Sequence, residues 1–335
     1  MSAPPAPARR SAADSSADAE VIKAGGSVAT AYALLTLTAL LWAGNAITSR
    51  WAPGHVSPQV ITTLRWLIAC TVLVPLAGPR VRSEWPVLRR HWLRIILMGG
   101  LGYTTFNCLF YAAGTYTGAI NLALFQGSIP VLVIVLNRLA YGVPVTAGQI
   151  VGVCLTLAGA ALAASHGDLS ALVRLDFNRG DALVFAACLL YAGYTVVLPM
   201  RPKVSALSFF AAMAAAAFVT SLPPLAWEWA GGHAVWPSAG GWAMVVFVGL
   251  GPSLLAQLCF MRGVEAIGPN RAGLFVNLVP VFGAGLAVLL IGEPFGPMEA
   301  ASLALVLGGI ACAERLKPPA PVAEAAYSQT RTRRR

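Results

Sequence analysis

Apolar residues in this chain are gathered into long runs, and the polar and charged residues lie mainly between the runs. A helix needs ~20 mostly apolar residues, rising about 1.5 Å each, to cross ~30 Å of hydrocarbon. Runs of this kind predict ten transmembrane helices, at 28–49, 58–77, 91–112, 119–138, 147–164, 180–198, 205–227, 241–261, 272–291 and 297–314. The connections between them are short, so neighbouring helices are expected to run antiparallel.

The composition argues against a water-soluble domain. The 335 residues are 57% hydrophobic and 11% charged, whereas a soluble domain carries roughly 25% charged residues. The formal net charge is +10, but the Lys and Arg residues lie at the ends of apolar runs, and nucleic-acid binding needs them on one water-facing surface. We therefore expect an all-α integral membrane protein whose partners are the lipid bilayer and a small solute, with no nucleic acid.

The distribution of positive charge predicts the orientation. With the N-terminus in the cytoplasm, nineteen Lys and Arg residues lie on the cytoplasmic side and three on the other, while Arg65 lies within a span. Cytoplasmic connections of membrane proteins carry this excess. We expect a multi-pass monomer of the plasma (inner) membrane, with a disordered cytoplasmic tail at 1–27 and a basic cytoplasmic tail at 316–335.

Two halves of the chain correspond to each other at an offset of 150 residues. The matched positions are Gly118 and Gly268, Leu124 and Leu274, Phe125 and Phe275, Pro130 and Pro280, Gly142 and Gly292, Pro144 and Pro294, and Gly159 and Gly309. Shared Gly and Pro residues are evidence of an internal repeat, because these residues determine backbone geometry. The pattern predicts a first repeat at 28–164, a connection at 165–179 and a second repeat at 180–315. Since five spans are an odd number, the repeats are expected to be inverted, which is typical of secondary transporters.

Several short motifs resemble a known family. They are LLWAGN in the first span, TTLRW in the second, the Gly-x-x-x-Gly-Ala-x-Asn run at 114–121, and GEP before the tenth span. Together with the ten-span layout, they resemble the EamA-like branch of the drug/metabolite transporter superfamily over residues 28–315. The resemblance implies export of amino acids and other small metabolites. One departure is that the first repeat has Val143 where the second has Glu293, so two glutamates with symmetric roles are excluded.

Polar residues inside the spans are the first candidates for a solute site, because a polar group in hydrocarbon is costly unless it faces a cavity or a partner. The amides are Asn45, Asn107, Asn121, Gln126, Gln257 and Asn277. The alternative is that they join helices by hydrogen bonds. Arg65 has two interpretations: it either extends to the membrane surface or faces the cavity as a contact for an anion.

Aromatic residues recur in the same helices. Those with a possible binding role are Trp42, Tyr103, Phe106, Tyr191 and Tyr194. Tyr103, Phe106 and Phe110 share one face of the third span with Asn107, which would suit a flat or amphiphilic solute. Interfacial anchoring and core packing are the alternatives. Pro130 and Pro280 lie within spans at matched positions and are expected to kink them.

No cofactor, metal or catalytic activity is expected. The six cysteines and four histidines have no metal-ligand spacing, and no nucleotide-binding motif is present. No cluster of acid–base or nucleophilic residues indicates an enzyme. The open alternative to a secondary exporter is a passive channel or a lipid-handling protein.

The positions of the carboxylates bear on the solute and on energy coupling. They lie near the expected ends of spans: Asp181, Glu228, Glu293, Glu299, Glu265 and Glu314. Carriers of cations, and carriers driven by protons, generally use an ionisable group within the membrane. We therefore expect a neutral, zwitterionic or anionic solute that moves by alternating access down its own gradient. Glu293 is the residue that could carry a proton if it is buried.

Overall fold

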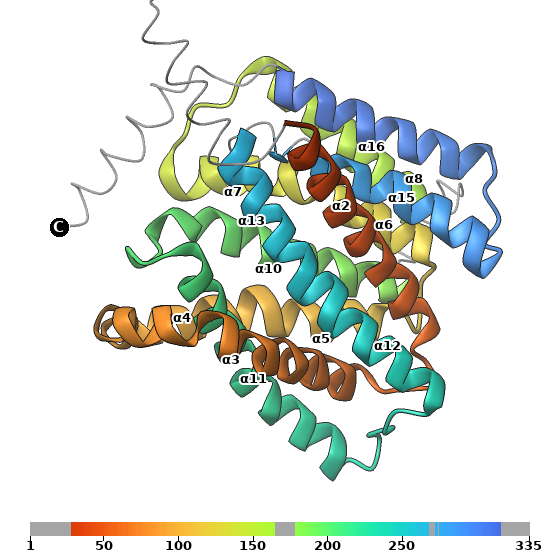
Figure 1. Ribbon diagram of the computed structural model, residues 1–335. Coiled ribbons are helices and arrows are strands. Elements are labelled where there is room, and N and C mark those ends of the chain that lie inside the picture. The colour runs from red at the N-terminus through yellow and green to blue at the C-terminus, as the bar shows by residue number, and fades with distance from the viewer. Residues whose placement is uncertain (1–27, 165–177, 268–271, 274, 316–335) are drawn as a thin grey trace, which may run out of the picture.

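The computed structural model describes residues 28–164, 178–267, 272–273 and 275–315, all in helices or in the connections between them (Figure 1). The first half contains α2 (Val28–Trp51), α3 (Pro58–Arg90), α4 (Trp92–Gly99), η1 (Gly100–Thr105), α5 (Phe106–Ala113), α6 (Ala119–Gly127), α7 (Ile129–Tyr141) and α8 (Ala147–Ala164). The second half contains α10 (Arg179–Val197), η2 (Leu198–Met200), α11 (Ala206–Ala230), α12 (Ala239–Leu250), η3 (Gly251–Leu255), α13 (Ala256–Ile267), η4 (Phe275–Asn277), α15 (Leu278–Leu286), η5 (Ala287–Ile291) and α16 (Pro297–Arg315). The predictions for both tails and for 165–177 lie outside the described residues.

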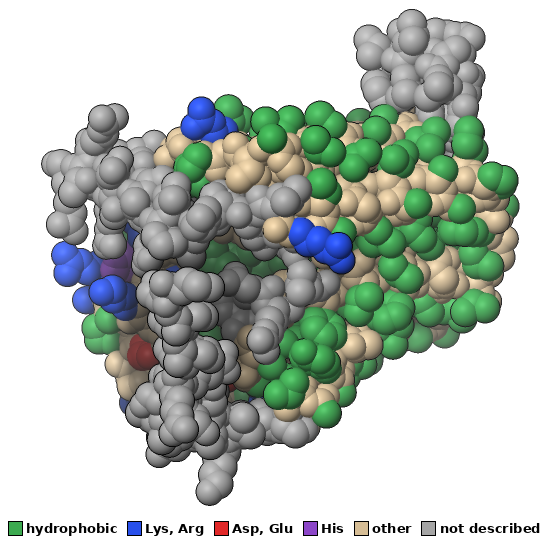
Figure 2. Space-filling model, turned by 90° about the horizontal axis from the view of Figure 1, so that it is seen from above, with side chains coloured by type: hydrophobic (Ala, Val, Ile, Leu, Met, Phe, Trp, Pro, Cys, Tyr) green, Lys and Arg blue, Asp and Glu red, His purple; other side chains and the backbone are tan. Residues whose placement is uncertain are grey.

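Seven continuous helices among the described residues are long and apolar enough to cross a membrane. Shorter apolar helices at Ala147–Leu162, Phe275–Ile291 and Pro297–Ala313 accompany them. Large apolar side chains such as Val74, Leu139 and Leu289 are exposed on the outside of the bundle. In Figure 2, hydrophobic side chains cover much of the face shown, and most of the visible Lys and Arg side chains gather towards one end. This surface is typical of a multi-pass membrane protein.

The predicted end of the second span at residue 77 is wrong. Helix α3 continues for 33 residues to Arg90 and includes Pro75, Pro79 and Pro86. A proline removes one backbone hydrogen bond but need not end a helix when the neighbouring bonds hold it. The arginine-rich stretch therefore extends the helix, and only His91 separates α3 from α4.

The two matched prolines lie near interruptions of the helical backbone. Pro130 is the second residue of α7, which follows α6 after Ser128. Pro280 lies in the first turn of α15, directly after the 3₁₀ turn η4. The matched glycines Gly142 and Gly292 both have left-handed backbone, with φ of 66° and 71°, and end α7 and η5. Only glycine adopts this conformation without strain.

Helices of the two halves pack against each other in matching pairs. Helix α3 packs along α11, α6 against α15, and α8 along α16. Helix α2 of the first half lies beside α13 of the second half. Their equivalents, α10 of the second half and α5 of the first half, also pack together. The largest buried cluster joins α3, α4, η1 and α11 around Trp66, Tyr103 and Met213. Residues on α2, α3, α5 and η3 are thereby brought together in the interior.

Candidate functional site

A buried arginine lies at the meeting point of both halves. Arg65 on α3 is 4% exposed, so it does not extend to the surface. Its Nε donates to Ser253 Oγ (2.7 Å), and its Nη1 donates to Asn107 Oδ1 (2.6 Å), Tyr111 Oη (2.6 Å) and Asn45 Oδ1 (3.2 Å). The Tyr111 hydroxyl also donates to Asn45 Oδ1 at 2.7 Å. These residues form what we call the Arg65 centre.

The acceptors of the Arg65 centre are all neutral. Among the described residues, no carboxylate forms an ion pair with the guanidinium, and no hydrogen bond is found for its second terminal nitrogen, Nη2. A buried charge without a counter-charge is costly, even when its hydrogen bonds are partly satisfied. The site can therefore bind a negatively charged group.

Two π-helical segments help to build the centre. Tyr103 lies in η1 and Ser253 lies in η3, at positions 150 residues apart. Asn107 donates from Nδ2 to the Tyr103 carbonyl at 2.6 Å, which directs its Oδ1 towards Arg65. Ser253 Oγ donates to the Val248 carbonyl at 2.7 Å and accepts from Arg65 with a lone pair of the same oxygen. π-Helical turns are rare and frequently mark functional sites.

A row of aromatic rings extends from the Arg65 centre. Trp66 stacks on Tyr103, with ring centroids 4.9 Å apart and an interplanar angle of 1°. Further contacts of 5.2 to 5.5 Å join Tyr103 to Tyr194, Tyr194 to Tyr191, Tyr191 to Phe106 and Phe106 to Phe110. The Arg65 guanidinium lies 5.6 Å from the Trp66 ring centroid. We call these rings the aromatic row.

Glycine allows one of these contacts. A Cβ at Gly102 would lie 2.6 Å from Tyr194 Cγ, closer than real Cβ contacts allow. The ring of Tyr194 thus lies against the bare backbone of η1, as only glycine permits. The indole Nε1–H of Trp66 is buried and has no hydrogen-bond partner among the residues that the structure describes, which leaves a donor on the residue next to Arg65 that a ligand could use.

The structure brings together only some of the residues predicted from the sequence. Asn45, Arg65 and Asn107 belong to the Arg65 centre, and Tyr103, Phe106, Tyr191 and Tyr194 belong to the aromatic row. The others lie apart: Trp42 contacts Phe260 at 5.5 Å, and Gln126, Gln257 and Asn277 have no hydrogen bond to the centre among the described residues. Gln126 Nε2 and Asn277 Oδ1 are buried and have no hydrogen-bond partner in the described part of the chain.

Two residues of the Arg65 centre, Tyr111 and Ser253, and Trp66 of the aromatic row were not among the predicted site residues. Trp66 and Tyr111 were detectable, because one follows Arg65 directly and the other lies one helical turn after Asn107. Ser253 carried no signal, since a serine within an apolar run is usually bonded to its own helix. Only the packing of η3 against α3 places it beside Arg65.

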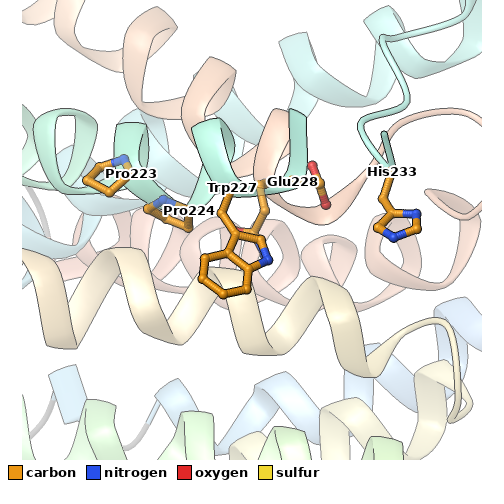
Figure 3. Close-up of a pocket in the computed structure, with 6 residues that line it drawn as sticks. Pro223, Pro224, Trp227, Glu228 and His233 are labelled. Atoms are coloured by element: carbon orange, nitrogen blue, oxygen red, sulfur yellow. The ribbon is translucent and has the colours of Figure 1, made fainter. Parts of the chain in front are cut away.

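A cavity opens beside the Arg65 centre. It has a volume of about 310 Å³ and is lined by the 52–58 turn together with Tyr111, Thr115, Glu228, His233 and Val235. A second cavity, of about 490 Å³, shares Glu228 and His233 and adds Gln59, Pro223, Pro224 and Trp227. Figure 3 shows Glu228 between Trp227 and His233 at the end of α11. We refer to the smaller space as the Glu228 cavity.

Two carboxylates hold the start of α6. Glu293 accepts from the backbone N–H groups of Ala119 (2.8 Å) and Ile120 (3.0 Å). Its charge therefore lies at a helix N-terminus, where the dipole stabilises it. Asp181 is 2% exposed and accepts from Thr117 Oγ1 at 2.7 Å. Asp181 was expected near the end of a span, but its burial was not predicted from the sequence.

No group of three or more potential metal ligands is found among the described residues.

Comparisons with known proteins agree with this architecture. The model of the EamA-like transporter family matches the chain twice, at residues 29–165 and 178–314. The uncharacterized transporter YyaM of Bacillus subtilis is 24% identical over 78% of this chain and 86% of its own length. The aromatic amino acid exporter YddG of Ancylobacter novellus is 25% identical over 83% of this chain and 94% of its own. A solved crystal structure with 21% identity has the same fold, with a TM-score of 0.60 over 87% of this chain and 99% of that one.

Proposed function

The chain belongs to the EamA-like transporter family, and from this premise we propose that it exports an amino acid with an aromatic side chain, or a closely similar zwitterionic or anionic metabolite. It is a membrane transporter and not an enzyme. The observation that carries the proposal is Arg65: a buried guanidinium whose acceptors, among the described residues, are all neutral and come from three other helical segments.

A solute carboxylate would supply the missing counter-charge. Nη2 of Arg65 and the Nε1–H of Trp66 are donors without protein partners among the described residues. Arginine presents its donors in a geometry that matches a carboxylate. A neutral solute would leave the charge of Arg65 uncompensated, and a cation would be repelled by it.

The aromatic row favours a flat side chain on the solute. Ring–ring contacts contribute about 0.5–1.5 kcal/mol beyond the burial of area. Rings from η1, α5 and α10 lie in one continuous row that begins beside Arg65. An amino acid bound through its carboxylate could place its ring among them. The name of the relative from Ancylobacter novellus, an aromatic amino acid exporter, supports the same class of solute.

Transport is proposed to occur by alternating access between two inverted five-helix repeats. The double family match and the matching packing of α2 with α13 and of α10 with α5 support this arrangement. The excess of Lys and Arg supports the further proposal that the protein is a ten-span monomer of the plasma membrane with both termini in the cytoplasm. Both carboxylate oxygens of Glu293 accept hydrogen bonds from backbone N–H groups. Because these bonds stabilise the charged carboxylate, they support transport without proton coupling.

The proposal is tested by counterflow of radiolabelled phenylalanine in proteoliposomes. Wild-type protein should exchange it with saturable kinetics, and Arg65→Gln should weaken its binding by about 100-fold, because removing one partner of a buried charge pair costs about 2–5 kcal/mol. Arg50→Gln is the matched control, since Arg50 is exposed at the end of α2, and it should exchange normally.

Two results would contradict the proposal. The first is wild-type exchange that Arg65→Gln leaves unchanged, and the second is robust transport of ethidium, a permanent cation. Channel-like currents from the reconstituted protein would instead support a passive channel, because a carrier passes no such current.

A further inference from the structure

We propose that the Glu228 cavity is a second solute site, at which the Glu228 carboxylate receives the ammonium group of an amino acid after its carboxylate leaves Arg65. This inference rests on the proposed function. In this inference the cavity binds the ammonium end of the zwitterion whose carboxylate binds Arg65. Glu228 then distinguishes amino acids from acids that lack an ammonium group.

The cavity is adjacent to the Arg65 centre. Tyr111 lines the cavity, and its hydroxyl accepts from Arg65 at 2.6 Å and donates to Asn45 at 2.7 Å. Tyr111 therefore belongs both to the Arg65 centre and to the lining of the cavity. The volume of about 310 Å³ is at the lower end of the range of about 300–1,000 Å³ for sites of small molecules.

Glu228 is the carboxylate among the residues that line this cavity, and no described residue supplies a counter-charge for it. The one hydrogen bond of its carboxylate among the described residues comes from Ser57 Oγ, at 2.6 Å to Oε2. No ion pair of Glu228 is found there, although His233 lines the same cavity. The side chain is half-buried, so its charge is screened less than on an open surface. A partly desolvated carboxylate facing a cavity is the partner that an ammonium group requires.

The hydrogen bond between Ser57 and Glu228 also connects solute binding to the segments that line the cavity. Ser57, which holds Glu228, also donates its backbone N–H to the Val235 carbonyl at 3.1 Å and accepts at Oγ from the Val235 N–H at 3.2 Å. An ammonium group at Glu228 would compete with the Ser57 hydroxyl for the carboxylate. Binding would thus weaken the link between the 52–58 turn and the end of α11, two segments that line the cavity.

The opposite end of the same helix pair provides a matched control. Glu84, near the end of α3, accepts from the N–H and the hydroxyl of Ser205, both at 2.9 Å, where Ser205 precedes α11. Glu228, near the end of α11, accepts from Ser57, which precedes α3. The two contacts have the same chemistry, but Glu84 does not line the Glu228 cavity.

The experiment compares counterflow of phenylalanine with that of phenyllactate, which has a hydroxyl in place of the ammonium group. Wild-type protein should exchange both. Glu228→Gln retains an acceptor for Ser57 and should slow phenylalanine exchange by about tenfold, the effect of one charge-assisted hydrogen bond, while phenyllactate changes by less than about twofold. Glu84→Gln should leave the ratio of the two rates as in the wild type.

Ser57→Ala separates a structural role from a binding role. It removes the hydrogen bond but leaves the carboxylate, so the ratio of phenylalanine to phenyllactate exchange should stay at the wild-type value. A lower ratio of phenylalanine to phenyllactate exchange in Ser57→Ala than in the wild type would overturn the second site while leaving the proposed function intact. An equal effect of Glu228→Gln on the exchange of both solutes would do the same. Wild-type protein that exchanges neither solute would overturn the proposed function itself, and with it this inference.

Discussion

The Nη1 atom of Arg65 lies 2.6 Å from the hydroxyl of Tyr111, and Tyr111 at the same time forms part of the wall of the Glu228 cavity. Tyr111 thus belongs both to the Arg65 centre and to the lining of the cavity that we propose as a second solute site. Because the same hydroxyl also donates to Asn45, α2, α3 and α5 are joined at this point. The first prediction follows from this contact.

Replacing Tyr111 by Phe should reduce both stability and transport. The ring would keep its packing, but Arg65 and Asn45 would each lose a buried hydrogen-bond partner, which costs about 1–3 kcal/mol. We expect a lower midpoint of thermal unfolding in detergent and several-fold slower counterflow of phenylalanine. Tyr103→Phe is the control, because the Tyr103 hydroxyl makes only a contact of 3.4 Å with Tyr194. An equal loss in both variants would argue against a special role of Tyr111.

Gly102→Ala should disturb the aromatic row. The added Cβ would lie 2.6 Å from Tyr194 Cγ and 2.7 Å from its Cβ, and overpacking of this kind costs about 1–3 kcal/mol. We expect a lower unfolding midpoint and weaker binding of phenylalanine, both measured on purified protein. Gly193→Ala, next to Tyr194 in the chain, meets no atom within 4 Å and should behave as the wild type. Normal binding by Gly102→Ala would show that the row is not the ring site.

Single cysteines should reveal the orientation of the chain. An impermeant thiol reagent added to intact cells should label Cys in place of Ser238, which caps the exposed start of α12, and not Cys in place of Ser328 in the basic tail. The reason is the distribution of Lys and Arg residues, with nineteen on the expected cytoplasmic side and three on the other side. Labelling of position 328 but not of 238 would reverse the proposed topology.

A pH gradient should not drive accumulation of the solute. Glu293 is occupied by two backbone N–H groups, and no carboxylate contacts Arg65 among the described residues. Proteoliposomes with an imposed gradient should therefore reach the same solute level as those without one. Accumulation above equilibrium that is lost in Glu293→Gln or in Asp181→Asn would identify that carboxylate as the proton carrier. Asp181 is included because the structure buries it.

The hydropathy pattern was sufficient to predict an all-helical chain and to locate most of the helices. A span must be apolar over its whole length because lipid cannot hydrogen-bond to the chain, so each helix is marked locally. The end of α3 was predicted wrongly, because the prediction followed the apolar run, whereas the helix continues through the arginine-rich stretch that comes after it. Local signals thus identify a helix more reliably than its last residue.

The sequence by itself also determined which residues are candidates for the site. Asn45, Arg65 and Asn107 are polar residues in apolar runs, and the cost of burying them predicts a shared role. Their grouping was decided only by the tertiary structure: Arg65 meets Ser253 across 188 positions of the chain, whereas Gln126 and Asn277 lie elsewhere. The rotation of each helix about its axis sets which polar residues face one another, and it results from packing against helices far away in the sequence.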